Sequence, residues 1–267
     1  MIKLLQIEYL KVKNYKTFWW ILGIYAVLVP LTFLALIDFF LMITETFPFF
    51  PSRSEILGFP NIWNYVTWVA SCWNILLGVL VVILVCNDIA YKTQRQHVIE
   101  GLSRREMIMG KFIFLVGLAA AITVYTFLLG FIIGSMYSSP AKFTNEIYYL
   151  FIYYIQTIGY FAFAFFWAIL IRKPALAIIL FVVVILLDGI FLNIPKIGEA
   201  AQFFPTIAIS QLTPFPFGKE FLDAAKAQGQ DVDGVFIMSQ ALRSIISLIY
   251  IGGFIAVSYL SVKRRDL

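Results

Sequence analysis

Charge is scarce in this 267-residue sequence, in which Asp, Glu, Lys and Arg together make up only 13% of the residues. A soluble chain of similar length carries about 25% charged residues, so the composition excludes an ordinary soluble domain. Hydrophobic residues account for 61% of the chain and aromatic residues for 18%. Because helices satisfy their own backbone hydrogen bonds in lipid, the sequence predicts an all-α, polytopic membrane protein.

Residues that carry catalytic or metal chemistry are also few. The one histidine, His97, has no cluster of cysteines or acids beside it, which argues against a metal site. Cys72 and Cys86 are separated by about 21 Å of helix, too far for a disulfide, and we interpret them as packing residues. Neither H-E-x-x-H nor G-x-S-x-G occurs, and Gly110-Lys111 lacks the other residues of a phosphate loop. The sequence therefore predicts a chain without catalytic residues, bound cofactor or metal.

Six apolar runs are each long enough to cross a hydrocarbon core of about 30 Å as a helix. A proline inside the first run, Pro30, predicts a kink there. We treat the whole chain, residues 1–267, as a single transmembrane domain. The predicted spans are Phe18–Ile43, Trp63–Cys86, Phe112–Tyr137, Ile147–Ile171, Ala175–Ile194 and Ser244–Val262.

Lysine and arginine are distributed unevenly between the two sides that these spans define. Fourteen of the 20 lie in Lys3–Lys16, Lys92–Lys111, Arg172–Lys173 and Lys263–Arg265. The positive-inside rule assigns such segments to the cytoplasm, which predicts cytoplasmic N and C termini. The net charge of +5 follows from this topology, so we infer contact with membrane lipid and none with nucleic acid.

Residues 1–17, ahead of the first span, have a helical pattern. Ile2, Leu5, Tyr9 and Val12 fall on one face, and lysines lie beside them. This loosely amphipathic pattern is typical of a helix that lies in the membrane interface. A plain cytoplasmic extension of the first span is the alternative.

The segment Asn87–Lys111 is a polar, basic island between two apolar runs. Gly101 is a natural helix terminator, because it reaches the left-handed conformation at little steric cost. Ser103 and Glu106 form an S-x-x-E capping box, which begins a new helix. The island is therefore predicted to contain a short polar helix, a break at residues 101–103, and a helix that enters the membrane. A short helix in that place needs a soluble partner.

The longest segment between two spans is Pro195–Arg243, on the outer side. Its first part, Ala200–Phe217, is too apolar for a solvated loop and too broken by prolines for a span. This part fits either a re-entrant or interface-lying hairpin or a loop that caps the bundle. The next part, Lys219–Gln228, has a composition that favours a helix.

Several polar residues fall inside the apolar runs. Asp188 lies in the outer half of the fifth run, where a buried acid is a candidate substrate contact or proton site. Alternatively, Asp188 pairs with Arg243 or with a backbone group at the outer mouth. Asn74, Gln156 and Thr157 fall near mid-bilayer, where they either join helices or line a path. Asn74, Gln156 and Asp188 are therefore the candidates for a substrate path.

Four features occur together in this chain: the amphipathic N-terminal helix, the six spans, the long outer loop before the last span, and the basic tail VKRRDL. The island adds the motif R-x-x-V-I-E-G-L-S-R at Arg95–Arg104. Together these features resemble the permease subunit of a type-2 ABC exporter. The resemblance covers essentially the whole chain, and the motif in the island is its most specific part.

In that family the island holds a coupling helix, which docks in a groove on a separate ATPase subunit. Two permease chains face each other, as a homodimer or a heterodimer, and ATP and magnesium belong to the ATPase. The resemblance further implies a multi-pass protein of the bacterial inner membrane, and it leaves the cargo open. By position, the ATPase-coupling role falls on Asp88, Lys92, Arg95, His97, Glu100, Gly101, Ser103 and Arg104.

Two other classes of membrane protein remain as alternatives. An ion-gradient-driven secondary transporter or channel would use Asp188, but the sequence has no inverted repeat or paired broken helices. An intramembrane protease would need histidine and carboxylates at matched depth, and the one histidine lies in the island. An ABC ATPase reading frame beside this gene would separate these classes.

Overall fold

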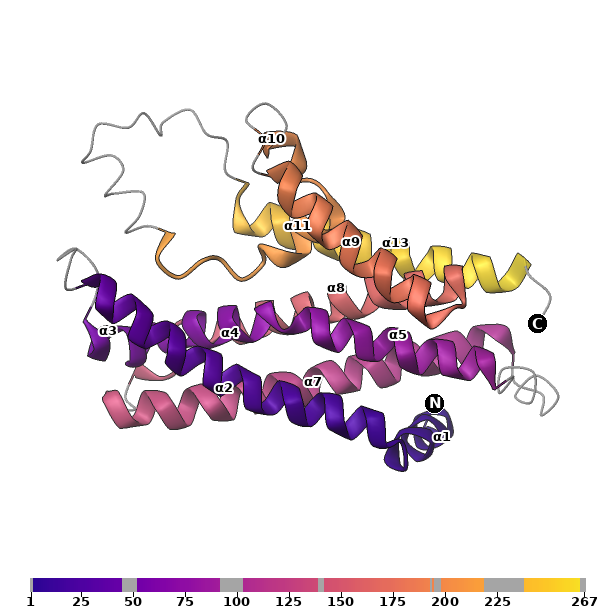
Figure 1. Cartoon of the computed structure of the whole chain (residues 1–267), viewed down its shortest axis with the longest axis horizontal. Coiled ribbons are helices and arrows are strands. Elements are labelled where there is room, and N and C mark those ends of the chain that lie inside the picture. Colours follow the sequence, from indigo (N-terminus) through magenta and orange to yellow (C-terminus); the bar gives the residue numbers. More distant parts are fainter. Residues whose placement is uncertain are drawn as a thin grey trace.

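The computed structural model describes residues 2–44, 52–91, 103–138, 142–192, 194, 198–218 and 238–264, and their regular structure is helical throughout. This agrees with the predicted all-α fold (Figure 1). The helices are α1 (Ile2–Lys13), α2 (Lys16–Thr44), α3 (Arg53–Leu57), α4 (Ile62–Cys72), α5 (Asn74–Ala90), α7 (Arg104–Tyr137), α8 (Tyr148–Ile171), α9 (Pro174–Leu192), α10 (Gly198–Ala201), α11 (Pro205–Ser210) and α13 (Gln240–Arg264).

Five of the six predicted spans are confirmed as long apolar helices, and the second is divided between two helices. Helices α2, α7, α8, α9 and α13 each have the length and hydropathy of a membrane span, whereas α4 and α5 reach them only together and are bent by 45° where they meet. At the bend, the N–H of Trp73 donates to the carbonyl of Ala70 at 3.1 Å, a three-residue turn that tightens the helix. Its indole Nε1 also donates to Oγ1 of Thr32 on α2 at 3.0 Å. The bend is therefore fixed by a contact with a neighbouring helix.

Both chain ends lie at the same end of the bundle. Helix α1, the end of α5, the start of α7 and the C terminus gather on the right in Figure 1, and α3 lies at the opposite end. Helix α1 is separate from α2 and is viewed nearly end-on where α2 runs along the bundle. This orientation favours an interfacial helix over a plain extension of the first span.

Helix α8 is the centre of the bundle. It contacts α4, α5 and α7, which lie on one side of it in Figure 1, and α9, α11 and α13, which lie on the other. Of its most apolar stretch, 61% is buried, against 17–28% for the other unbent spans. Small residues such as Ala162, Ala164 and Ala168 are fully enclosed. Short side chains at these positions let neighbouring helices approach closely.

The segment 198–218 packs into the bundle and is not a solvated loop. Helix α11 contacts α8, α9 and α13, and its residues Thr206–Ile209 are buried. Gly159 of α8 makes room for it, because a Cβ there would lie 2.8 Å from Cγ2 of Ile209. This packing favours the predicted hairpin over a loop that merely caps the bundle. The helix predicted at Lys219–Gln228 lies outside the described residues.

Candidate functional site

Four charged side chains join three helices at the end of the bundle that holds the N terminus. This junction cluster comprises Glu8 and Lys11 of α1, Asp88 of α5 and Lys111 of α7. The Nζ of Lys11 lies 2.8 Å from Oε1 of Glu8 and 3.5 Å from Oδ2 of Asp88. Lys111 contacts Asp88, and its Nζ lies 3.1 Å from Oε2 of Glu8. Two cations and two carboxylates are thus interleaved.

The place of each cluster residue in its own helix explains where its side chain lies. Glu8 and Lys11 are three residues apart on α1 and therefore share a face. Asp88 lies in the last turn of α5. Helix α7 begins at the predicted capping box, in which the N–H of Glu106 donates to Oγ of Ser103 at 3.2 Å and the N–H of Ser103 donates to the Glu106 carboxylate at 2.8 Å. The capping box is confirmed, and it starts the helix that carries Lys111.

An apolar layer supports the cluster. Val12 of α1, Phe18 of α2, and Leu80 and Leu84 of α5 form one buried group. This layer keeps water away from one side of the charges, so their attraction is screened less than on an open surface. The three helices are therefore joined by packing as well as by charge.

Burial and neighbouring charge shift the pKa of Glu8 in opposite directions. Glu8 and Lys111 are each only 8% exposed. Burial alone would raise the pKa of Glu8, but the charges of Lys111 and Lys11 outweigh it and hold the pKa below its ordinary value of 4.5. Glu8 is consequently a carboxylate at neutral pH, and the cluster keeps its pairing.

The described part of the chain contains three of the eight residues predicted to couple to an ATPase. Asp88 contacts Lys11 and Lys111 in the junction cluster, so part of its role is internal to the protein. Ser103 is the N-cap of α7, and Arg104 is the first residue of that helix. The other five, which lie outside the described residues together with the predicted break, are Lys92, Arg95, His97, Glu100 and Gly101.

Sequence reasoning did not find the junction cluster. Counting basic residues treats Lys11 and Lys111 only as topology signals, and Glu8 has no signal of its own. The pattern that could have indicated the cluster is an acid at the end of one span and a lysine at the start of the next, together with a Glu–Lys pair on the preceding amphipathic helix. That pattern becomes a site only when the three helices converge.

Asn74 and Gln156, predicted for a substrate path, are fully buried and contact polar groups on other elements. The hydroxyl of Tyr153 lies 3.5 Å from Oδ1 of Asn74 and 2.6 Å from the hydroxyl of Tyr25. Gln156 donates to the carbonyl of Ser210 at 2.7 Å and accepts from Thr213 at 3.0 Å. These contacts link different helices and segments, Nδ2 of Asn74 is buried without a hydrogen-bond partner among the described residues, and the path role of both residues stays a prediction.

Asp188, the third predicted path residue, is 8% exposed and accepts a hydrogen bond from the hydroxyl of Thr206 on α11. This contact replaces the expected pairing with Arg243 or a backbone group. Arg243 instead donates through Nη1 to the carbonyl of Gln211 at 2.9 Å. Asp188 and Arg243 therefore contact opposite ends of α11, and Asp188 does not share partners with Asn74 or Gln156.

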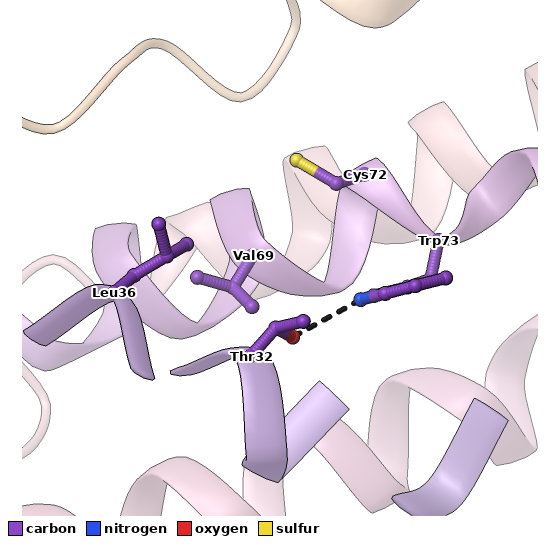
Figure 2. Close-up of a pocket in the computed structure, with 5 residues that line it drawn as sticks. All are labelled: Thr32, Leu36, Val69, Cys72 and Trp73. Carbon is purple, nitrogen blue, oxygen red and sulfur yellow. Dashed lines mark hydrogen bonds between the residues drawn. The ribbon is translucent and has the colours of Figure 1, made fainter. Parts of the chain in front are cut away.

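A small cavity of about 250 Å³ lies beside the bend between α4 and α5 (Figure 2). The polar groups of Trp73 and Thr32 on its wall already have partners, since Trp73 donates to Thr32 and Thr32 donates to the carbonyl of Leu28 at 2.6 Å. The cavity therefore suits an apolar group. Both cysteines are free thiols, as predicted, and Cys72 is on its wall. The lining residues are Thr32, Leu36, Val69, Cys72 and Trp73.

Comparison with known protein families gives a match over most of the chain. A family model described as ABC-2 family transporter protein matches residues 4–188, well over half of the sequence. That range contains all four members of the junction cluster and ends at Asp188, so α11 and α13 lie beyond it. No curated protein matches the sequence. Among the described residues, no group of three or more His, Cys, Asp or Glu could hold a metal ion.

Proposed function

The chain belongs to the ABC-2 family of transporter proteins, as a multi-pass permease component, and we propose that it couples ATP hydrolysis in a separate ATPase subunit to export. The ATPase would bind ATP and magnesium, and the residues of this chain would transmit movement. We further propose a location in the bacterial inner membrane, with both termini and the island Asn87–Lys111 in the cytoplasm. Two permease chains would face each other in the complex.

The observation that carries this proposal is the position of the junction cluster. Asp88 and Lys111 stand at the two ends of the island that would meet the ATPase, and they contact each other. Because Lys111 also pairs with Glu8, the ends of α5 and α7 cannot separate from α1 without leaving buried charge unpaired. A push on the island would therefore move three helices as one body, which is how ATPase closure can bias a two-state permease.

Complex formation with the cognate ABC ATPase tests the proposal. The double variant Arg95→Glu/Glu100→Lys should lower co-purification of the ATPase and its stimulation by the permease, because it reverses charge on the predicted docking helix. Arg53→Glu, an exposed change on α3 at the other end of the bundle, is the matched control. Wild-type co-purification and stimulation by the double variant would refute the assignment of docking to the island.

Cysteine labelling tests the orientation. In a background with Cys72 and Cys86 replaced by Ala, an impermeant maleimide applied to intact cells should label Gln228→Cys and leave Gln96→Cys unlabelled. This follows from the distribution of lysine and arginine. Labelling at position 96 without labelling at 228 would invert the topology and place the island away from any cytoplasmic ATPase.

A further inference from the structure

Proline removes one hydrogen bond from the middle of the first span. Helix α2 runs from Lys16 to Thr44 with Pro30 inside it. Because proline has no backbone N–H, the carbonyl four residues earlier, that of Ala26, loses the donor that a helix would supply. Ala26 is ten residues, or about 15 Å, from the start of α2, which is half the thickness of a hydrocarbon core of about 30 Å. Lipid at that depth has no water to replace the donor.

A side chain from another span supplies the missing donor. The hydroxyl of Tyr125 on α7 donates to the carbonyl of Ala26, with 2.6 Å between the two oxygens. Helix α2 crosses α7 in the view of Figure 1, and this bond joins them. Donors from neighbouring helices are one means by which membrane helices tolerate proline. The gap in α2 is therefore filled by α7, although 99 positions separate the two residues in sequence.

An aromatic neighbour on α2 helps to position Tyr125. The ring of Tyr125 is half-buried, and its centroid lies 6.2 Å from that of Tyr25, the residue before Ala26. Tyr25 is 2% exposed, and its hydroxyl lies 2.6 Å from the hydroxyl of Tyr153 on α8. The part of α2 that precedes Pro30 is therefore tied to both α7 and α8.

The two halves of α2 are held by different parts of the bundle. Before Pro30, the bonds of Tyr25 and Ala26 run to α8 and α7. After Pro30, Thr32 accepts from Trp73 at the bend between α4 and α5. A helix kinks most readily at a proline, because it lacks a hydrogen bond there. A shift of α7 relative to the bend would therefore be taken up at Pro30.

We propose that Tyr125 is a positioning residue for transport, which closes the gap at Pro30 and passes movement of α7 to the first half of α2. Helix α7 is continuous from Arg104, beside the island, to Tyr137, and it also carries Lys111 of the junction cluster. Displacement of the island by an ATPase would reach Tyr125 through this one helix, and α2 would bend at Pro30 as a hinge. The transmission rests on the proposed function, whereas the closure of the gap does not.

Distances measured along α2 test whether Tyr125 closes the gap. In a background with both cysteines replaced by Ala, nitroxide labels on Trp20→Cys and Met42→Cys flank Pro30, and both positions are exposed. Electron–electron double resonance on the purified full-length protein should give one narrow distribution of the distance between the labels. Tyr125→Phe should broaden this distribution toward shorter distances, because α2 loses the donor that replaces its own N–H. Tyr137→Phe, which alters an exposed tyrosine of α7, should leave it unchanged.

Pro30→Ala separates the bond to Ala26 from the packing of the Tyr125 ring. The alanine restores the N–H that α2 lacks, so the double variant Pro30→Ala/Tyr125→Phe should keep the narrow distribution. Broadening in the double variant would show that Tyr125 acts through other contacts, and it would overturn the proposal. An unbroadened distribution in Tyr125→Phe alone would overturn it as well.

Addition of the cognate ATPase tests the transmission. With the ATPase and a non-hydrolysable ATP analogue bound, the distance between the labels in the wild type should shift. The shift should be lost in Tyr125→Phe and kept in Tyr137→Phe, and an equal shift in all three proteins would overturn the transmission. Failure of the ATPase to bind the wild type would refute the proposed function and the transmission with it, while the distributions without ATPase would still decide whether Tyr125 closes the gap.

Discussion

At the end of the bundle that carries both termini, buried charges neutralise one another, whereas beside α11 they contact uncharged groups. In the junction cluster, Lys111 contacts two carboxylates at once. Near α11, Asp188 accepts from a threonine hydroxyl and Arg243 donates to a carbonyl. The first arrangement depends on the balance of charge among three helices, and the second on the hydrogen bonds of a short inserted helix.

The two regions therefore differ in what a single substitution leaves behind. Removal of one charge from the junction cluster leaves an excess charge in a half-enclosed site, which is strongly destabilising. Removal of one partner near α11 leaves an unsatisfied polar group, a smaller loss. If this distinction is correct, substitutions at the junction should lower the free energy of unfolding more than substitutions near α11. A second substitution that restores charge balance should rescue the junction, whereas one that removes the remaining partner should rescue the region near α11.

Lys111→Met should have the largest effect. It leaves Glu8 and Asp88 with Lys11 as their one remaining partner in the cluster, and we expect the free energy of unfolding to fall by about 3 kcal/mol. Adding Glu8→Gln restores neutrality and should recover part of the loss. Unfolding in mixed micelles, followed by circular dichroism, measures both. Lys13→Met, at an exposed position of α1, is the control, and an equal effect of the two lysine variants would contradict the balance argument.

Gly159→Ala tests the insertion of α11 at the other region. The added Cβ would lie 2.8 Å from Cγ2 of the buried Ile209, and overpacking of this kind lowers the free energy of unfolding by about 1–3 kcal/mol. Gly117→Ala on α7 meets nothing within 4 Å and should be neutral or slightly stabilising. Combining Gly159→Ala with Ile209→Ala should remove the clash. Equal unfolding curves for the two glycine variants would show that α11 does not approach α8 closely.

Thr206→Val should have an effect no larger than that of Gly159→Ala. It removes the hydroxyl that donates to Asp188 and leaves a buried carboxyl without that donor, a loss of about 1–3 kcal/mol in the free energy of unfolding. The double variant Thr206→Val/Asp188→Leu replaces both partners with apolar groups and should be nearly neutral. A double variant less stable than Thr206→Val would show that Asp188 has a further polar partner.

Lowering the pH should reduce the free energy of unfolding through the junction cluster, and this effect should be the smallest of the four. The pKa of Glu8 in the folded protein is below the ordinary value of 4.5, so its contribution is present above about pH 4.5 and is lost as pH falls through the folded value. When the pH is lowered from neutral to below about 4.5, the free energy of unfolding should fall more for the wild type than for Glu8→Gln. The same unfolding assay at stepped pH measures the difference, and parallel pH profiles for the two proteins would argue against the ion pairs of Glu8.

The spans and the capping box could be predicted because their signals are local. A run of about 20 apolar residues defines a span, and Ser103 with Glu106 defines the start of α7 within four residues. The bend at Trp73 had no such signal, since no glycine or proline lies there. It depends on a hydrogen bond to Thr32, which is 41 residues away in sequence.

The roles of the buried polar residues depended on contacts between distant segments. The sequence placed Asn74, Gln156 and Asp188 at membrane depth but left open whether they join helices or line a path. The structure supplies their partners, Tyr153, Ser210 and Thr206, which come from other helices or from the segment after α10. Likewise, Glu8 and Lys111 are more than 100 residues apart in sequence, and only the convergence of α1 with α7 makes them a pair.

The central position of α8 has a consequence for biogenesis. Its mean hydropathy, 1.7, is the lowest among the unbent spans, whereas α9 after it has the highest, 3.0. A helix that carries Gln156 and several tyrosines gains less from lipid than its neighbours do when it leaves the translocon. Three of its partners, α4, α5 and α7, are synthesised before it. The order of the chain therefore supplies α8 with a protein surface at the moment of insertion, and α9, α11 and α13 then enclose it from the other side.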